Sequence, residues 1–442
     1  MGRRRRRPEP TGPFEITVDD LAADARGVAH ADGKAVFIPD SLPGEHVRYM
    51  RVGGRASYDE GRLEAVLQAS DDRVAPRCEH FGYCGGCALQ HLSGDAQLTF
   101  KAHQLLETLR RIGGVEPEAL LPPINGAQYQ YRRRARLGAK HVPKKGGVLV
   151  GFRERGAPFI ANLSRCEVLV AEVGERIHDL EALVGRLSIR DRVPQIEVAG
   201  GDDSVALIFR VLDDPTPADR DALSAFARQT GLIIYLQPGG VDSITPLDNP
   251  ADLSYRLPEF DVEIRLEPQD FAQIHGEVNR LMVSQAVRLL APAADEQVLE
   301  LFSGVGNFSL PLARRAGQVH SVEGEAGLVH RAIENARHNG IGNLSAHVGD
   351  LFEAQDDAPW ARLSYDKLLL DPPRSGAREI LPLAVRSRPK AVVYCSCHPA
   401  TLARDAQTLV KEYGYRLAAA GVVNMFPHTA HIEAMALFEL ED

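Results

Sequence analysis

Two cysteines stand at the junction of an apolar run and a helical pattern near the C-terminal end of the chain. Residues 394–399 read Tyr-Cys-Ser-Cys-His-Pro; they follow the strand-like run 391–394 and precede a helical pattern over 400–413. A thiol at the carboxyl edge of a sheet, just before a helix N-terminus, has its thiolate favoured by the helix dipole. We therefore expect a nucleophilic cysteine here, either Cys395 or Cys397.

A thiol nucleophile suits one class of methyl acceptor. The C5 carbon of uracil is a poor nucleophile, but addition of a thiolate at C6 turns the ring into an enolate and makes C5 reactive. A base must then remove the C5 proton so that the thiol can leave. The reaction needs one cysteine and one carboxylate, and the segment 426–435 offers His428, His431 and Glu433 as candidate bases.

A glycine turn and three acids indicate a nucleoside cofactor. Gly304 and Gly306 follow the strand-like run 297–301 and allow a tight turn with close approach of a ligand to the backbone. Glu323, Asp350 and Asp371 each close one of the next strand-like runs, and the carboxyl ends of parallel strands share one edge. Acids without a phosphate-binding lysine favour S-adenosylmethionine, whereas NAD would need a full G-x-G-x-x-G and ATP a Walker loop.

Four further cysteines form a possible metal-ligand set. Their number is the number that a [4Fe-4S] cluster uses. Structural zinc also takes four cysteines, usually as two C-x-x-C pairs, and only one such pair occurs here. The spacing favours the cluster and leaves zinc as the alternative. The set is Cys78, Cys84, Cys87 and Cys166.

The elements around these residues change character along the chain. Short strand-like runs split by Gly and Pro over 14–68 predict a small barrel of the OB kind. Strands recur over 129–268 with helices expected at 172–187 and 217–228. From about residue 271, strands alternate with helices, at 278–290, 328–339 and 400–413 among others, which predicts a doubly wound parallel sheet.

Charge is segregated in this mildly acidic chain. The 442 residues carry a formal net charge of −9, which excludes a wholly basic nucleic-acid binder. The run Arg3–Arg7 and the acid-free segment 129–145 are the basic exceptions, and the second predicts contact with a polyanion. No 18-residue apolar run and no secretory signal occur, so we expect a cytoplasmic protein without a membrane span, with reduced cysteines.

Taken together, these motifs resemble the RNA uridine-5 methyltransferase family, in particular its bacterial members that modify 23S ribosomal RNA and carry an iron–sulfur cluster. The resemblance covers nearly the whole chain from Phe14. The Ser-Cys-x-Pro-Ala-Thr run and the Phe-Pro-His-Thr ending are specific to the family, whereas the glycine turn is not. The matching segments are 78–87, 304–308, 371–376, 396–405 and 426–433.

The resemblance implies a fold and a division of the chain. The fold is α/β: a Rossmann-like, S-adenosylmethionine-dependent methyltransferase domain with an N-terminal OB-like TRAM barrel and a β-rich central iron–sulfur domain. The implied division places a basic tail at 1–13 and the TRAM barrel at 14–70. It gives 76–95 with 128–268 to the central domain, and 96–127 with 269–442 to the catalytic domain.

The resemblance also implies roles for individual residues. The catalytic cysteine falls on Cys397 and the proton-abstracting carboxylate on Glu433. The cluster ligands fall on the four cysteines named above. The methyl-donor contacts fall on Gln273, Phe302, Asn307, Glu323, Asp350 and Asp371.

The sequence departs from the family pattern at two positions, where His275 and His398 replace the usual asparagines. The implied partner is 23S ribosomal RNA, with transfer RNA as the alternative substrate, and the protein is expected to be a monomer. Two other functions stay open. Asp371-Pro-Pro also suggests an exocyclic-amine N-methyltransferase, and a non-catalytic RNA-binding iron–sulfur protein is the third possibility.

Overall fold

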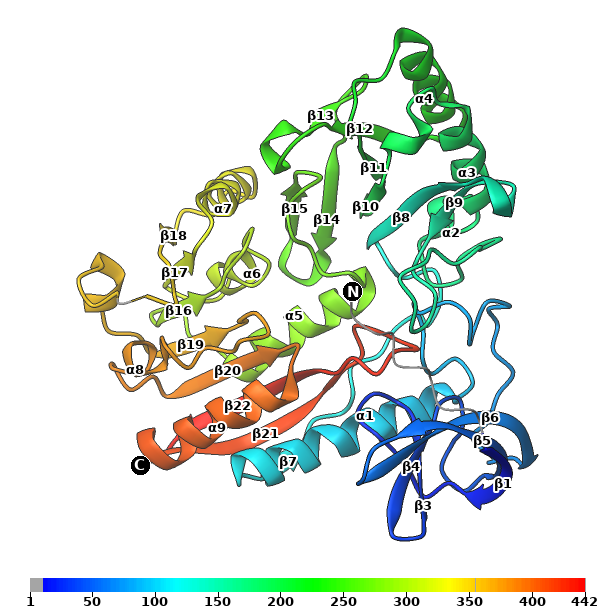
Figure 1. Cartoon of the computed structure of the whole chain (residues 1–442). Coiled ribbons are helices and arrows are strands. Elements are labelled where there is room, and N and C mark those ends of the chain that lie inside the picture. The colour runs from blue at the N-terminus through cyan, green and yellow to red at the C-terminus, as the bar shows by residue number, and fades with distance from the viewer. Residues whose placement is uncertain (1–10, 354, 442) are drawn as a thin grey trace, which may run out of the picture. The chain divides into compact units, whose positions relative to one another are not determined.

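The computed structural model describes residues 11–353 and 355–441 (Figure 1). The run Arg3–Arg7 and most of the tail 1–13 lie outside the described residues. The chain divides into two compact units. The first takes in the chain up to Gln104 together with Glu154–Ala157 and Pro427–Ala430, and the second contains the remainder.

The first unit is built on a six-stranded sheet with the order β1-β5-β6-β4-β3-β2. Alternating burial along β5 places Val47 and Tyr49 inside, where they pack with Val18, Val36 and Ile38. This period-two pattern is what one buried sheet face requires. The sequence therefore predicted the β character of this region correctly. The strands are β1 (Thr11–Thr17), β2 (Asp20–Leu21), β3 (Gly27–Ala31), β4 (Lys34–Ile38), β5 (His46–Gly54) and β6 (Tyr58–Gln68).

A second apolar cluster of the first unit lies beside the cysteine-bearing segment. Leu89, Leu92 and Phe100 pack there with Leu21, Ala25 and Leu42. Helix α1 (Gly94–Thr108) starts in this cluster, and its Gln97 accepts a 2.9 Å hydrogen bond from the backbone N–H of His428. The carbonyl of His428 in turn accepts from the N–H groups of residues 88 and 89. These bonds make the short segment 427–430 part of the first unit.

The second unit contains two smaller sheets besides its largest one. The first has the order β13-β12-β11-β10-β8-β9, and the second is the hairpin β14-β15. The strands are β8 (Arg134–Val142), β9 (Gly147–Gly151), β10 (Gln195–Gly200), β11 (Val205–Arg210), β12 (Ile233–Gln237), β13 (Thr245–Pro246), β14 (Leu253–Leu257) and β15 (Val262–Leu266). The helices are α2 (Ala171–Gly174), α3 (Ile177–Arg186) and α4 (Pro217–Thr230).

The prediction of a single helix over 172–187 is wrong, because two helices, α2 and α3, occupy this segment. The chain turns closely past residue 166 between them: a Cβ on Gly174 would lie 2.4 Å from the carbonyl oxygen of Cys166. The N–H of Cys166 also donates a 2.8 Å hydrogen bond to the carbonyl of Gly174. This close approach ends α2 at its only glycine.

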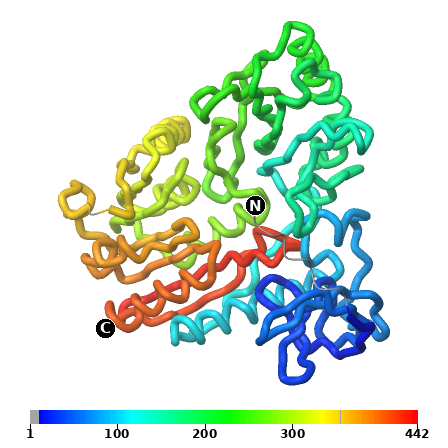
Figure 2. Tube along the Cα trace, in the orientation of Figure 1, coloured from blue at the N-terminus to red at the C-terminus, as the bar shows by residue number. Residues whose placement is uncertain are grey.

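The largest sheet of the second unit has eight strands in the order β18-β17-β16-β19-β20-β22-β21-β7. All of them except β7 come from the last third of the chain, which Figure 2 draws in yellow-green to red. Five of them, from β18 to β20, are parallel. Figure 1 shows α5 on one face of the sheet and α9 on the other. The strands are β7 (Ala119–Leu120), β16 (Gln297–Leu301), β17 (Gln318–Glu323), β18 (Leu344–Val348), β19 (Lys367–Leu370), β20 (Ala391–Ser396), β21 (Tyr415–Val423) and β22 (Glu433–Leu440). The helices are α5 (Gly276–Leu290), α6 (Ser309–Ala313), α7 (Ala326–His338), α8 (Leu381–Ala384) and α9 (Pro399–Tyr413).

The expectation of a wholly parallel sheet is corrected at one end. Strand β22 pairs antiparallel with both β20 and β21. The final hairpin returns between β20 and β21, so the sheet is mixed. The alanine-rich run of β21 gives a weak strand signal, which is why the alternating pattern read from the sequence stopped at the last helix. The consequence matters for chemistry, because Glu433 begins the inserted strand.

No helix within residues 11–353 and 355–441 combines the length and the apolar character that crossing a bilayer requires.

Candidate active site

One cavity of about 660 Å³ in the second unit gathers the acids, the glycine turn and a thiol. It opens at the edge where β16, β17, β18, β19 and β20 end, which is where open α/β sheets bind ligands. All eight residues implied as catalytic or methyl-donor contacts line it. They are Cys397, Glu433, Gln273, Phe302, Asn307, Glu323, Asp350 and Asp371.

The glycine turn is shaped by Glu323. One carboxylate oxygen of Glu323 accepts a 3.0 Å hydrogen bond from the N–H of Gly304, and the other accepts from the N–H of Glu325 at 3.1 Å. Gly304 and Gly306 have φ values of 53° and 97°, which favour glycine. A Cβ on Gly306 would lie 2.3 Å from a side-chain atom of Leu310. The acid at the end of β17 thus fixes the backbone that approaches a ligand.

A pair of amides closes the deep side of the cavity. The Oδ1 atom of Asn307 accepts hydrogen bonds from Asn279 at 2.9 Å and from the hydroxyl of Tyr255 at 2.8 Å. Its Nδ2 donates to the side-chain oxygen of Asn279 at 2.9 Å. Burial raises the pKa of Tyr255, so its hydroxyl stays a donor. Tyr255 comes from β14, outside every motif, and no sequence signal pointed to it.

Two acids, Asp371 and Glu300, lie in surroundings that disfavour their ionised form. Burial raises the pKa of Asp371 to about 7. Burial also raises the pKa of Glu300 to about 8, against the hydroxyl of Ser309, which donates to it. Asp371 and Glu323 add to the shift of Glu300. A cation in this cavity would relieve the like-charge interaction among these carboxylates.

The surroundings of Cys397 act against the helix dipole that was expected to favour its thiolate. Burial raises the pKa of Cys397 to about 11, and the charges of Glu433 and Asp371 add to the rise, whereas the guanidinium of Arg374 opposes it. The α9 dipole acts from the helix that begins at Pro399. Loss of hydration and two nearby carboxylates thus oppose the effect of that dipole.

The turn that carries Cys397 is held at both ends. On one side, Ser396 accepts a 3.1 Å hydrogen bond from the N–H of His398 and donates to its carbonyl at 3.2 Å. On the other side, buried Asp405 of α9 accepts from the hydroxyl of Tyr394 at 2.7 Å. The strand before the thiol and the helix after it are therefore tied together.

The remaining candidate groups from these two segments differ in their placement: one is buried, one lines the cavity and one does not. Cys395 is fully buried, and burial raises the pKa of its thiol well above the usual value, which leaves it a neutral, packed side chain. His431 lines the cavity and its ring meets that of Phe426 edge-on at 4.3 Å. His428, the third candidate base, belongs to the first unit and does not line this cavity.

The exposed residues that line the cavity include two aromatic rings and one cation. Phe271 and Phe352 are 64% and 44% exposed, and both line it. The ring of Phe352 lies 5.9 Å from that of Phe302. Arg374 is exposed and is the one Arg or Lys among the described residues that line the cavity.

His275, the first departure from the family pattern, does not line this cavity. Its Nδ1 accepts from the N–H of Val278 at 3.4 Å, capping α5, and its Nε2 lies 2.8 Å from the carbonyl oxygen of Ala127. Its ring stacks on Tyr131 at 4.7 Å. The histidine therefore serves the start of a helix.

The structure leaves the four-cysteine ligand set untested. Cys78, Cys84 and Cys87 belong to the first unit and Cys166 to the second. Among the described residues, no three His, Cys, Asp or Glu side chains are grouped so that they could hold a metal ion. Within the first unit, burial raises the pKa of the Cys84 thiol and Cys78 adds to the rise, so these two thiols interact. The N–H of Gly86 points at the Cys84 sulfur at 3.4 Å.

The basic segment 129–145 is only partly available for a polyanion. Arg133 forms a 2.6 Å ion pair with Asp202, and Arg134 donates to the carbonyl of Pro268 at 2.6 Å. These two arginines are therefore engaged within the protein, and contact of the segment with RNA stays a prediction. Its exposed bases are Arg136, Lys140, Lys144 and Lys145.

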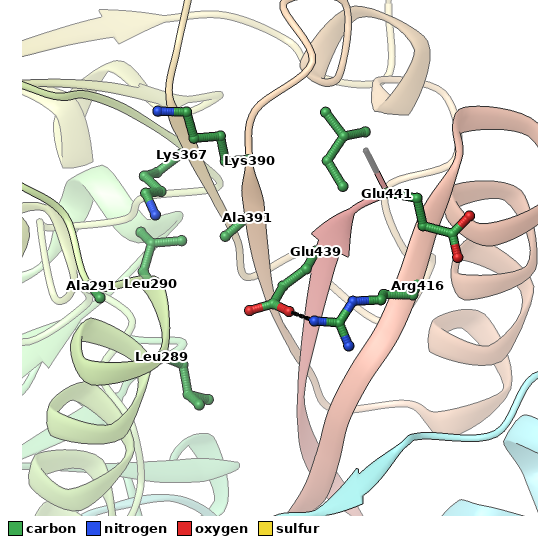
Figure 3. A pocket seen from close by; sticks show the side chains of 10 residues that line it. Leu289, Leu290, Ala291, Lys367, Lys390, Ala391, Arg416, Glu439 and Glu441 are labelled. Carbon is green, nitrogen blue, oxygen red and sulfur yellow. Dashed lines mark hydrogen bonds and ion pairs between the residues drawn. The ribbon is translucent and has the colours of Figure 1, made fainter.

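A second cavity of about 530 Å³ lies at the opposite edge of the large sheet (Figure 3). Lys367, Lys390 and Arg416 line it together with Glu439 and Glu441. Figure 3 shows the carboxylate of Glu439 joined to the guanidinium of Arg416. Its lining contains no thiol, imidazole or glycine turn, so the first cavity is the candidate active site.

Comparison with known proteins agrees with this assignment. A family model described as tRNA (Uracil-5-)-methyltransferase matches residues 254–440. A 23S rRNA (uracil(1939)-C(5))-methyltransferase, RlmD, of Alkalilimnicola ehrlichii is 51% identical over 100% of this chain and 99% of its own. The chain belongs to the uracil-C5 RNA methyltransferase family. The RlmD enzyme of Methylococcus capsulatus is 50% identical over 99% of this chain and 100% of its own.

A solved structure of another methyltransferase has the same fold as this chain. The tRNA (uracil-54, C5)-methyltransferase of Pyrococcus abyssi, in complex with S-adenosyl-L-homocysteine, aligns with a TM-score of 0.74. The alignment covers 96% of this chain and 100% of that one, at 24% identity. The catalytic part of the chain thus has the S-adenosylmethionine-dependent methyltransferase fold with a mixed sheet.

Proposed function

We propose that this protein transfers a methyl group from S-adenosylmethionine to C5 of a uridine in 23S ribosomal RNA. The observation that carries the proposal is the meeting of Cys397, Glu433 and Asp371 in one cavity with the glycine turn. The full-length relatives named for this reaction support the choice of RNA. When bound, the cofactor supplies the methyl group on a sulfonium cation.

The residues of this chain have separate roles in the proposal. Cys397 adds to C6 of the uracil and makes C5 nucleophilic. Glu433, buried at the start of β22, removes the C5 proton after methylation so that the thiol can be expelled. Burial raises the pKa of Cys397 in the ligand-free site, and the cation of a bound methyl donor would favour its thiolate.

The cofactor contacts are proposed from their place on the cavity wall. Glu323 and Asp350 end neighbouring strands and offer carboxylate oxygens to ribose hydroxyls and to an adenine edge. Phe302 has a φ of 66° and presents its ring beside that of Phe352, which suits a flat ring system. Gln273, Asn307 and Asp371 complete the implied set.

The cysteine test separates this function from its alternatives. RNA containing 5-fluorouridine, mixed with the protein and the methyl donor, should form an adduct that resists denaturation, because fluorine cannot leave as a proton does. Cys397→Ala should abolish the adduct and Cys395→Ala should retain it. An adduct on Cys397→Ala would end the nucleophile assignment, and methylation without Cys397 would favour the N-methyltransferase reading.

The RNA class is tested in cells that lack the protein. Nucleoside mass spectrometry should show loss of 5-methyluridine from 23S ribosomal RNA and its return when the wild-type gene, but not the Cys397→Ala form, is supplied. Transfer RNA is the competing substrate, because the family model and the structural relative carry that name. Loss of the nucleoside from transfer RNA alone would select it.

The remaining proposals concern the parts outside the cavity. We assign 14–70 to a TRAM-type RNA-binding barrel, 76–95 with 128–268 to a central domain, and 96–127 with 269–442 to a catalytic domain. We expect the protein to be a monomer. We also assign Cys78, Cys84, Cys87 and Cys166 to a [4Fe-4S] cluster, whose thiolate donors suit iron. Protein purified without oxygen should be brown and absorb near 400 nm. A colourless protein that contains one equivalent of zinc would replace the cluster.

A further inference from the structure

The loop after β19 presents a single unpaired cation at the mouth of the candidate active site. Arg374 is exposed and lines the cavity, and its guanidinium has no hydrogen bond or ion pair within the described residues. The acidic side chains on the described cavity wall are Glu323, Asp350, Asp371 and Glu433, and no other Arg or Lys among the described residues lines it. An anion entering this cavity therefore has one place where it is attracted.

The loop that carries Arg374 is rigid. The N–H of Gly376 donates to the carbonyl of Pro373 at 2.9 Å and closes a turn around Arg374 and Ser375. Gly376 has a φ of 83°, which favours glycine. The carbonyl of Ser375 accepts from Arg404 of α9 at 2.9 Å. The guanidinium thus extends from a backbone that is fastened to the helix after Cys397.

His398 lies at the start of α9, and the charge of Arg374 acts on its imidazole. It is half-buried and is the N-cap residue of α9. Its Nδ1 faces the hydroxyl of Thr401 at 3.5 Å, and no described group bonds to its Nε2. Burial lowers the pKa of His398, and the neighbouring charge of Arg374 lowers it further. That charge also acts on Cys397, which directly precedes His398 in the chain and lines the cavity with Arg374.

We infer that Arg374 and His398 bind a backbone phosphate of the nucleotide whose uracil enters the cavity. The inference rests on the proposed function and names a further contact of that site. A uridine within RNA carries its base and a phosphate on one sugar, so a base at Cys397 holds a phosphate nearby. The carboxylates inside repel that phosphate. The cavity wall offers the guanidinium of Arg374, and His398 follows the cavity-lining Cys397 at the N-terminus of α9.

The first experiment measures RNA affinity as a function of salt. Full-length protein is titrated with a 23S ribosomal RNA transcript between 50 and 300 mM KCl, and methylation of the same transcript is assayed separately. Arg374→Gln should weaken binding about tenfold and reduce the slope of log Kd against log salt by about 0.7–0.9. Arg378→Gln, which removes an exposed charge four residues away and outside the cavity, is the matched control and should change neither.

The second experiment identifies the phosphate itself. A short RNA with the target uridine is made with one neutral methylphosphonate, placed either 5′ or 3′ of that uridine. One of the two replacements should weaken binding to the wild type about as much as Arg374→Gln does, and should weaken binding to the variant no further. Additive losses for both replacements would overturn the inference, because the guanidinium would then contact something else.

His398 adds a dependence on pH. A phosphate favours the charged imidazolium, so affinity for RNA should rise as pH falls from 7.5 to 5.5. The charge of Arg374 acts on this imidazole, and Asp371 also titrates in the cavity, so the pH profile of the wild type is compared with that of a variant without the imidazole. His398→Asn should remove part of the rise, and an identical pH profile in the variant would remove His398 from the site.

The methyl donor carries the competing oxyanion, its carboxylate. Calorimetric titration with S-adenosylhomocysteine should give the same Kd for wild type and Arg374→Gln. If the variant instead loses affinity for this ligand while the salt slope for RNA is unchanged, Arg374 binds the donor and the inference fails. Wild-type methylation of the transcript tests the proposed function independently, so the two failures are distinguishable.

Discussion

The hydroxyl of Tyr394 donates a 2.7 Å hydrogen bond to the carboxylate of Asp405, and this bond spans the turn that carries Cys397. Tyr394 lies in β20 and Asp405 in α9, so the bond joins the element before the thiol to the element after it. Asp405 also accepts from the N–H of Ala377, which follows the Arg374 loop. One fully buried carboxylate thus fastens both walls of the cavity mouth.

Tyr394→Phe should therefore slow the reaction of Cys397. Loss of the hydrogen bond should lower the free energy of unfolding by about 1 kcal/mol and leave an acceptor of Asp405 without its donor. The rate of adduct formation with 5-fluorouridine RNA should fall several-fold. The rate is followed by denaturing gel electrophoresis.

Tyr415→Phe is the control for this prediction. The Tyr415 hydroxyl donates to the carbonyl of Pro389 at 2.8 Å, and its side chain is equally buried. Tyr415→Phe should lower the free energy of unfolding by a similar amount without slowing adduct formation. Equal slowing in both variants would show that the effect is one of general stability.

Alkylation should report the raised pKa of Cys397. Burial, Glu433 and Asp371 raise this pKa to about 11, so in the ligand-free protein the thiolate fraction grows about tenfold per pH unit between pH 7 and 9. Labelling of Cys397 by iodoacetamide, measured by peptide mass spectrometry, should follow that slope.

Asp371→Asn removes one of the two carboxylates named as causes and should speed the labelling at each pH. A labelling rate that is independent of pH would mean that the thiolate is already formed. In that case the helix dipole would dominate, as the sequence alone suggested.

Binding of the methyl donor should release protons near neutral pH. Burial raises the pKa of Asp371 to about 7, so about half of these carboxyls are neutral at that pH. A sulfonium cation favours the ionised form, and its pKa should fall on binding. Calorimetry in two buffers of different ionisation enthalpy should show release of up to about 0.5 proton at pH 7.

S-adenosylhomocysteine supplies the comparison, because it lacks the positive sulfur. It should release fewer protons than S-adenosylmethionine, and Asp371→Asn should reduce the difference. Equal release with the two ligands would place the ionisation elsewhere.

Sequence reasoning located the site because strand ends are a local property. Glu323, Asp350 and Asp371 each follow an apolar run, and parallel strands bring such ends to one edge. The contribution of Tyr255 could not be read in this way. It lies in a hairpin outside the main sheet, 52 residues before its partner Asn307. Long-range packing of that kind leaves no periodic signal.

The electrostatics were harder to predict than the positions. The thiol of Cys397 was expected to be acidic from its place before a helix. Its environment depends on Glu433, which reaches it only because β22 inserts antiparallel beside β20. The pairing of Arg133 with Asp202 likewise joins residues 69 positions apart and removes a cation that the sequence counted as available.

The last prediction concerns Glu300, a fully buried carboxyl below the glycine turn. One of its oxygens, Oε1, has no hydrogen-bond partner among the described residues. Burial raises its pKa from 4.5 to about 8, so the folded protein holds it neutral where the unfolded chain ionises it. Its contribution to stability is complete below about pH 4.5 and is lost as pH rises through 8.

Glu300→Gln keeps the shape and an acceptor for Ser309 but cannot ionise. Between pH 5 and 8.5 the free energy of unfolding of the wild type should fall by about 1–3 kcal/mol more than that of the variant. Urea denaturation of the ligand-free protein at the two pH values measures this difference. Glu325→Gln, at an exposed position nearby, should follow the wild type, since removing a solvated charge leaves no buried ionisation to relieve. Parallel pH profiles for wild type and Glu300→Gln would mean that Glu300 is already ionised in the folded protein.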